Sequence, residues 1–149
     1  GVMVETPAAV MNAEAILGEV DFVSIGTNDL TQYTMAADRL LGDLAHLNNP
    51  WQPAVLKMIK MTVEGAQRAS VTVCGEAAAD PALAVVLIGL GVDTLSMNAG
   101  AIPAVAAVLK SVTKEKAQQI AAIALQQISS AEAKESARQA LPILDELGL

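Results

Sequence analysis

Acidic and thiol side chains follow three apolar runs of this sequence at matching positions. Glu5 ends the first run, Asp29 comes shortly after the second run has closed at Ile25, and Cys74 ends the third. Polar residues at the carboxyl ends of parallel strands meet at one edge of an α/β sheet, where such proteins place their chemistry. We therefore expect Glu5, Asp29 and Cys74 to belong to one site.

The spacing of Glu5 and Asp29 matches about one strand–helix unit, so the two would lie on neighbouring strand ends. Two carboxylates with open coordination positions suit Mg²⁺, which usually takes one or two protein carboxylates and completes its shell with water and substrate oxygens. Each residue alone has a simpler explanation, because Asp29 can begin a helix and Glu5 can be a solvated acid at a strand end. Their repetition at the same point of successive units favours a Mg²⁺ site.

Two features beside these carboxylates could bind an anion. Residues 26–28 precede an expected helix, and backbone N–H groups at a helix N-terminus bind phosphate or carboxylate. Arg39 carries a planar guanidinium that suits bidentate phosphate binding. From spacing alone, a surface ion pair of Arg39 with Asp38 or Asp43 is equally plausible.

The single cysteine, Cys74, is followed by Gly75 and Glu76. A lone buried cysteine is most often a small core residue. The glycine permits close approach of a ligand and the carboxylate brings polarity beside the thiol, so Cys74 could act as an acid or proton donor. His46 is the only histidine and lies in a polar segment, where we expect it to be solvated.

The elements that would position these residues alternate between strand and helix. We expect strands over residues 1–5, 20–25, 71–74 and 93–97. We expect helices over residues 8–17, 29–37, 53–69, 81–90, 101–110, 114–127 and 131–141. Residues 38–52 are polar and contain Gly, Asn and Pro, which predicts a long surface loop.

Four strands, each followed by a helix, predict a (β/α)4 unit. The strands are short, read as apolar on both faces and are joined by crossovers, which predicts a parallel sheet. A (β/α)8 barrel has eight such units over about 250 residues. We therefore expect an α/β fold in which residues 1–149 are the second half of a TIM (β/α)8 barrel, (β/α)4 followed by C-terminal helices.

The chain begins inside an expected strand, so we expect it to be a piece of a longer polypeptide. A half barrel has two open sheet edges, which readily pair with other strands. We expect it to pair with a second copy or with the missing half. The helices after Ala101 would form the outer layer of the barrel and part of a subunit interface.

Composition excludes several classes of partner. The net charge is −7 and the sequence pI is about 4.5, which disfavours nucleic acid and anionic membranes. One cysteine excludes an internal disulfide and fits a reducing cytosol, so we expect a cytoplasmic protein. No signal peptide is visible, and the longest apolar stretches are too short to cross a bilayer.

Several separate motifs together resemble one protein family. They are Gly1-Val-Met-Val-Glu-Thr-Pro7, Asp21-Phe-Val-Ser-Ile-Gly-Thr-Asn-Asp-Leu-Thr-Gln-Tyr33, Asp38-Arg39, and Cys74-Gly-Glu76 with Asp80-Pro81. In this order and spacing they closely resemble Enzyme I of the bacterial phosphotransferase system, the phosphoenolpyruvate–protein phosphotransferases. The resemblance runs to about Met97 and is weak beyond Ala101.

The resemblance implies a role for each matching residue of a phosphoenolpyruvate-binding barrel. Glu5 and Asp29 match the two Mg²⁺ ligands, and Asn28 and Arg39 match residues that bind the substrate phosphate. Cys74 matches the cysteine proposed to protonate the enolate of pyruvate. Mg²⁺ and an arginine would neutralise charge on the phosphoryl group during transfer. Positioning and charge stabilisation of this kind account for most of the catalysis of phosphoryl transfer.

The resemblance also implies partners outside this chain. They are phosphoenolpyruvate and pyruvate, a phosphorylated histidine in an N-terminal domain, the carrier protein HPr that serves sugar uptake, and a second copy in a homodimer. The Thr-Ser-His context of that histidine is absent here, so His46 is not given its role. The family's other phosphate-binding arginines lie on earlier strands. We therefore expect no phosphotransfer by this chain alone.

Three alternatives stay open at this point. Pyruvate phosphate dikinases share the Gly-Thr-Asn-Asp-Leu-Thr-Gln and Cys-Gly-Glu elements, although Tyr33 and the Asp38-Arg39 pair favour Enzyme I. Metal-dependent pyruvate aldolases also place Glu and Asp on successive strand ends, but they do not require the Cys-Gly-Glu element. A dimerisation module without a catalytic role is the third alternative.

Overall fold

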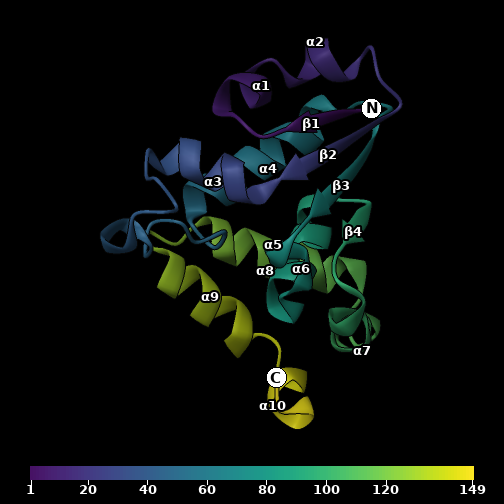
Figure 1. Ribbon diagram of the computed structural model, residues 1–149. Coiled ribbons are helices and arrows are strands. Elements are labelled where there is room, and N and C mark those ends of the chain that lie inside the picture. Colours follow the sequence, from purple (N-terminus) through teal and green to yellow (C-terminus); the bar gives the residue numbers. More distant parts are fainter.

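The computed structural model describes residues 1–149 and contains one four-stranded parallel sheet (Figure 1). The strands are β1 (Val2–Val4), β2 (Phe22–Gly26), β3 (Ser70–Cys74) and β4 (Thr94–Ser96), and they lie in that order across the sheet. All three pairs are parallel. The expected α/β fold with a parallel sheet is therefore confirmed, and each strand is within two residues of its expected bounds at either end.

Helices connect and follow the strands. They are α1 (Pro7–Met11), α2 (Ala13–Leu17), α3 (Thr27–Met35), α4 (Pro53–Gly65), α5 (Glu76–Ala79), α6 (Pro81–Leu90), α7 (Ile102–Lys110), α8 (Lys114–Leu125), α9 (Ser130–Gln139) and α10 (Ile143–Leu147), with short 3-10 turns η1 (Gly42–Leu44) and η2 (Ala99–Ala101). No helix combines the length and the apolar character that crossing a bilayer requires.

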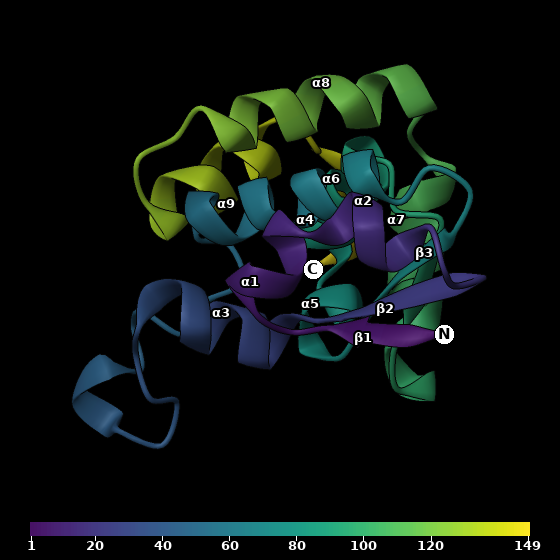
Figure 2. The same cartoon turned by 90° about the horizontal axis from the view of Figure 1, so that it is seen from above.

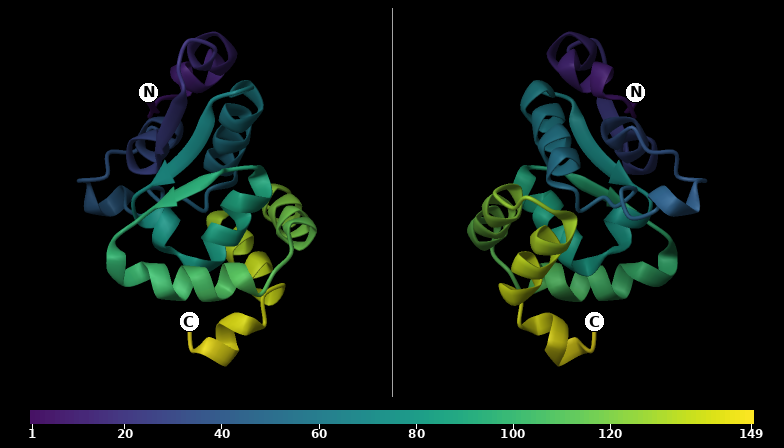
Figure 3. Two further views of the ribbon diagram at one scale, coloured as in Figure 1. Left: turned by 90° about the vertical axis from the view of Figure 1, so that its right-hand side faces the viewer. Right: turned by 90° about the vertical axis from the view of Figure 1, so that its left-hand side faces the viewer.

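The helices form two layers beside the sheet. Helices α2, α4, α6 and α7 contact one another in chain order, and Figure 2 shows α2, α4 and α6 on one side of β1 and β2. Helix α8 packs against α4 and α6, and α9 packs against α6 and α8, so the C-terminal helices form a second layer outside the first. Figure 3 shows α9 and α10 at the end of the molecule opposite α1 and α2.

The two faces of the sheet differ in burial. Val4, Ile25 and Val73 are neighbours in register, are 0% exposed and belong to the main hydrophobic core. The opposite face carries a row in register that is exposed or half-buried, namely Met3, Ser24, Thr72 and Thr94. The expectation of two apolar, buried faces is wrong for this second face. Its side chains alternate with the core residues, and no helix of this chain covers them.

Local signals explain where the helices begin. Proline occupies the first turn of α1, α4, α6 and α7, where its missing N–H costs no hydrogen bond. The Thr6 hydroxyl caps α1 by accepting from the backbone N–H of Ala9 at 3.3 Å. Asp80 caps α6 in the same way, because its carboxylate accepts from the N–H groups of Ala82 and Leu83.

Three expected elements need correction, and two helices are additional. The single helix over residues 8–17 is two helices, because Asn12 leaves the helical conformation (φ −107°, ψ 18°) and its amide donates to the Ala8 carbonyl at 2.8 Å. Helix α3 begins at Thr27, so Asp29 lies inside its first turn and is not its cap. Helix α4 ends at Gly65, shortly before Gln67 takes a φ of 45°. Helices α5 and α10 were not expected.

Candidate functional site

Glu5, Gly26 and Cys74 lie at one edge of the sheet, where the parallel strands end. Val4 pairs with Ile25, so Glu5 follows at the level of Gly26, and Gly26 in turn pairs with Cys74. Register therefore places the ends of β1, β2 and β3 side by side. This is the common edge that the repetition of strand ends predicts.

The side chain of Glu5 crosses directly over Gly26. A Cβ atom built on Gly26 would lie 2.5 Å from Glu5 Oε1 and 2.8 Å from its Cγ, distances that real Cβ atoms do not show. Glycine at this position therefore leaves room for the carboxylate beside the N-terminus of α3. The arrangement brings the Glu5 carboxylate next to the helix turn that holds Asn28 and Asp29.

Asp29 and Arg39 form an ion pair above the same edge. Arg39 Nη1 lies 3.8 Å from Asp29 Oδ1, and the side chains are 48% and 38% exposed. At that exposure the pair contributes little to folding, on the order of 0–1 kcal/mol. Arg39 thus faces Asp29, not Asp38 or Asp43, and the surface pairs considered from spacing are not formed.

Cys74 is half-buried at the end of β3. Its thiol donates to the Ile25 carbonyl across the sheet, with Sγ and O 3.5 Å apart. Gly75 adopts φ 93° and ψ −155°, a region that is essentially restricted to glycine. Backbone conformation alone thus requires a glycine after Cys74, whether or not a ligand approaches there.

A polar pocket of about 330 Å³ opens between α3, the segment 36–52 and the start of α5. It is lined by Asn28, Thr31, Arg39, Ala45, Asn48, Pro50 and Glu76. Two of the expected binding residues, Asn28 and Arg39, thus share one pocket. The pocket is not lined by Glu5, Asp29 or Cys74. Glu5 and Cys74 lie at the ends of β1 and β3, and Asp29 faces the Arg39 side chain. His46 is exposed and does not line it either, as expected for a solvated residue.

Three polar or charged residues of the pocket, Thr31, Asn48 and Glu76, are not among the expected binding residues. Thr31 lies one helical turn after Asn28, so helical periodicity would have placed it on the same side of α3. Glu76 follows the Cys74-Gly75 pair and was noted only as a polar neighbour of the thiol. Asn48 comes from the loop, and no local pattern in the sequence marks it.

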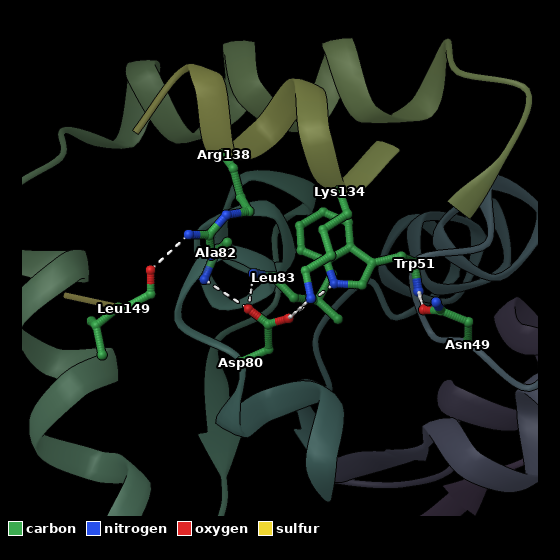
Figure 4. A network of polar contacts seen from close by, with 8 residues as sticks. All are labelled: Asn49, Trp51, Asp80, Ala82, Leu83, Lys134, Arg138 and Leu149. Carbon is green, nitrogen blue, oxygen red and sulfur yellow. Dashed lines mark hydrogen bonds and ion pairs between the residues drawn. The ribbon is translucent and has the colours of Figure 1, made fainter. Parts of the chain in front are cut away.

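The loop that carries Asn48 is anchored at its end by Trp51. Trp51 is 2% exposed, so the expected surface loop has a buried end. Its indole N–H donates to Asp80 Oδ2 at 3.0 Å, and its backbone N–H donates to Asn49 Oδ1 (Figure 4). Lys134 of α9 lies 3.9 Å from the same Asp80 oxygen. Asp80 therefore joins the loop, the start of α6 and α9.

The donor set at this edge suits a hard cation. No cluster of three or more His, Cys, Asp or Glu side chains is present. The carboxylates at the start of α3 are Glu5, which lies against Gly26, and Asp29, which is in the first turn. Both offer oxygen only, and Gly26 leaves the Glu5 carboxylate free to point along the strand end. Two carboxylates with the remaining positions open to water and substrate fit Mg²⁺.

Comparison with known proteins shows the family to which the chain belongs. Residues 1–114 match the family described as PEP-utilising enzyme, PEP-binding domain. The chain is 48% identical over 143 residues to a phosphoenolpyruvate-protein phosphotransferase of Streptomyces coelicolor, covering 95% of this chain and 26% of that protein. It is 44% identical over 134 residues to the protein of the same name from Haemophilus influenzae, covering 89% and 23%.

A multiphosphoryl transfer protein of Xanthomonas campestris is 48% identical over 128 residues, which are 85% of this chain and 15% of that protein. The chain therefore spans about a quarter or less of the length of these relatives. Because the family match covers most of the chain, this protein belongs to the PEP-binding domain family of the PEP-utilising enzymes.

Proposed function

We propose that this chain is the C-terminal part of the substrate-binding barrel of a phosphoenolpyruvate–protein phosphotransferase. The names of its relatives favour this reaction over those of a dikinase or an aldolase. Strands in sequential order, with their helices in contact in the same order, are what half of a (β/α)8 barrel would contain. The single observation that carries the proposal is the pocket that Asn28 and Arg39 share beside the Glu5 and Asp29 carboxylates.

Arg39 and Asn28 bind and orient the phosphoryl group of phosphoenolpyruvate in this proposal. The Arg39 guanidinium donates to phosphoryl oxygens, and its ion pair with Asp29 aims it at the pocket before substrate arrives. Glu5 and Asp29 would hold Mg²⁺, which supplies charge neutralisation for the phosphoryl oxygens. When the P–O bond breaks, the phosphoryl group passes to a histidine nitrogen supplied by another domain, and the enolate of pyruvate remains.

Cys74 completes the reaction by protonating that enolate. Its thiol already donates a hydrogen bond to the Ile25 carbonyl, so the proton is held at the strand edge. Transfer of this proton to the enolate carbon gives pyruvate and a thiolate, which regains a proton from solvent. The residue after the thiol, Gly75, borders open space, since a Cβ there would meet nothing within 4 Å.

The wider assignments extend the same proposal. We propose HPr as the protein that finally receives the phosphoryl group, a homodimer as the assembly and the cytoplasm as the compartment. The open edges of β1 and β4 and the uncovered sheet face support pairing with further barrel strands.

Calorimetric titration of phosphoenolpyruvate with Mg²⁺ into this chain tests the proposal. We expect binding by the natural chain that disappears in Asp29→Ala, because one of two metal ligands and the partner of Arg39 are both lost. Asp43→Ala is the matched control, since Asp43 is exposed and lies outside the pocket. Equal binding by all three proteins would refute the assignment. If none binds, repeating the titration with the preceding half barrel added in trans decides whether the half site alone is too weak.

A further inference from the structure

Two side chains of the pocket bury polar atoms that have no partner. Thr31 is 2% exposed, and its hydroxyl makes no hydrogen bond. Asn48 buries both the oxygen and the nitrogen of its amide, and neither is paired. Buried polar groups are nearly always satisfied, and leaving one unpaired destabilises the fold. Both side chains belong to residues that line the same pocket as Arg39.

The position of Asn48 is set by the anchored end of its loop. The next residue, Asn49, accepts the backbone N–H of Trp51 at its side chain and so closes a turn, and the buried Trp51 indole is hydrogen-bonded to Asp80. Asn48 therefore cannot readily swing outward to hydrate its amide. Thr31 is equally constrained, because it lies inside the rigid helix α3.

We infer that Thr31 and Asn48 are further binding residues of this pocket and that they hydrogen-bond the oxygens of a phosphoryl group. The inference rests on the proposed function and adds two residues to it. The Thr31 hydroxyl and the Asn48 NH₂ donate to phosphoryl oxygens. The Asn48 carbonyl oxygen accepts from a protonated oxygen of the ligand or from its water.

The chemistry of the lining favours a phosphoryl group over an apolar ligand. Arg39 supplies only donors, and the amides of Asn28 and Asn48 with the Thr31 hydroxyl add more. Glu76 is the one carboxylate in the wall, and it is exposed. A tetrahedral group with several acceptor oxygens can use donors that converge from different sides.

Isosteric substitutions separate a binding role from a structural one. Thr31→Val and Asn48→Leu keep the volume of each side chain and remove its polar atoms. The matched control is Thr62→Val, because Thr62 is also a fully buried helical threonine, but its hydroxyl is paired with the Met58 carbonyl at 2.9 Å and lies outside the pocket. Arg39→Gln is the positive control for the proposed function.

Thermal melts and two-dimensional NMR titrations with inorganic phosphate, phosphoenolpyruvate plus Mg²⁺, and pyruvate measure the outcome. We expect Thr31→Val and Asn48→Leu to leave Tm equal or raise it by about 2–4 °C, since an unpaired buried group is removed. We expect each to weaken phosphate and phosphoenolpyruvate binding by about tenfold or more, and pyruvate binding not at all. Thr62→Val should leave all affinities unchanged.

Three results would overturn the inference, and they differ from failure of the proposed function. Lower Tm with unchanged phosphate affinity in both variants means that the two groups are structural. Weaker pyruvate binding with unchanged phosphate binding means that the pocket holds the carboxylate. If only Arg39→Gln loses binding and Thr31→Val and Asn48→Leu bind normally, then Thr31 and Asn48 are not binding residues but the proposed function still holds. If the natural chain binds neither phosphate nor phosphoenolpyruvate at millimolar concentration, alone or with the preceding half barrel added in trans, both fail.

Discussion

Replacing Gly26 by alanine changes the position of one carboxylate and leaves the backbone undisturbed. Gly26 has φ −85° and ψ 89°, which an alanine can adopt. The new methyl would lie 2.5 Å from Glu5 Oε1 and 2.8 Å from Glu5 Cγ, so the Glu5 side chain must move. It can move, because it is half-buried and makes no hydrogen bond or ion pair with the rest of the protein.

The cost to folding is small and the cost to metal binding is large. Alanine at an unstrained glycine position stabilises by about 0.4–1 kcal/mol through the unfolded chain. Forcing Glu5 off its rotamer costs about 0.5–1.5 kcal/mol. The two effects nearly cancel, so we expect Tm to shift by less than about 4 °C. Displacing one of two carboxylate ligands should weaken Mg²⁺ binding by at least about tenfold, as loss of even outer ligand contacts does.

Calorimetric titration of Mg²⁺ in the presence of phosphoenolpyruvate, with a thermal melt of the same protein, measures both quantities. Gly42→Ala is the matched control, because a Cβ at Gly42 would meet nothing within 4 Å and the residue lies outside the pocket. Unchanged Mg²⁺ affinity in Gly26→Ala would refute the role of Glu5. A large fall in Tm would show that the glycine is needed for folding, and the reasoning on its close approach to Glu5 would be wrong.

Three further predictions concern the anchor, the thiol and one helix start. Asp80→Ala should destabilise the protein by about 2–4 kcal/mol, because the helix cap is lost and the Trp51 indole is left unpaired. The fluorescence emission of Trp51, the only tryptophan, should shift to the red. Unchanged emission would contradict the anchoring of the loop by Asp80. Cys74→Ala should leave phosphoenolpyruvate affinity unchanged but stop pyruvate formation by the complete enzyme, and normal pyruvate release would exclude the thiol as proton donor. A backbone hydrogen bond at the start of α8 lowers the pKa of Glu115 below 4.5, so its stabilising effect is present above that pH and is lost as the pH falls through the lowered pKa. The Tm difference between the natural chain and Glu115→Gln should therefore shrink on acidification, and a constant difference would contradict this.

Much of the fold was predictable because its signals are local. Short apolar runs separated by helical patterns identify the strands, and proline with a capping residue marks the helix starts at Pro7 and Pro81. These signals act within a turn of chain. Local signals predict the wrong structure at Asn12, where a side chain competes with the helix for a backbone carbonyl. They also cannot predict burial that depends on the packing of distant elements, as for Met3 and Ser24 on the uncovered face of the sheet.

The sequence by itself determined that Glu5, Gly26 and Cys74 share one edge, because parallel strands of similar length end together. It also placed Asp29 at the start of a helix at that edge with Asn28 just before it, and the structure puts both in the first turn of that helix. Only the tertiary structure decided which partner Arg39 has and that Thr31 and Asn48 face the same pocket. The reason is the loop of residues 36–52, whose path depends on the burial of its one indole and on a hydrogen bond to a carboxylate 29 residues further along the chain.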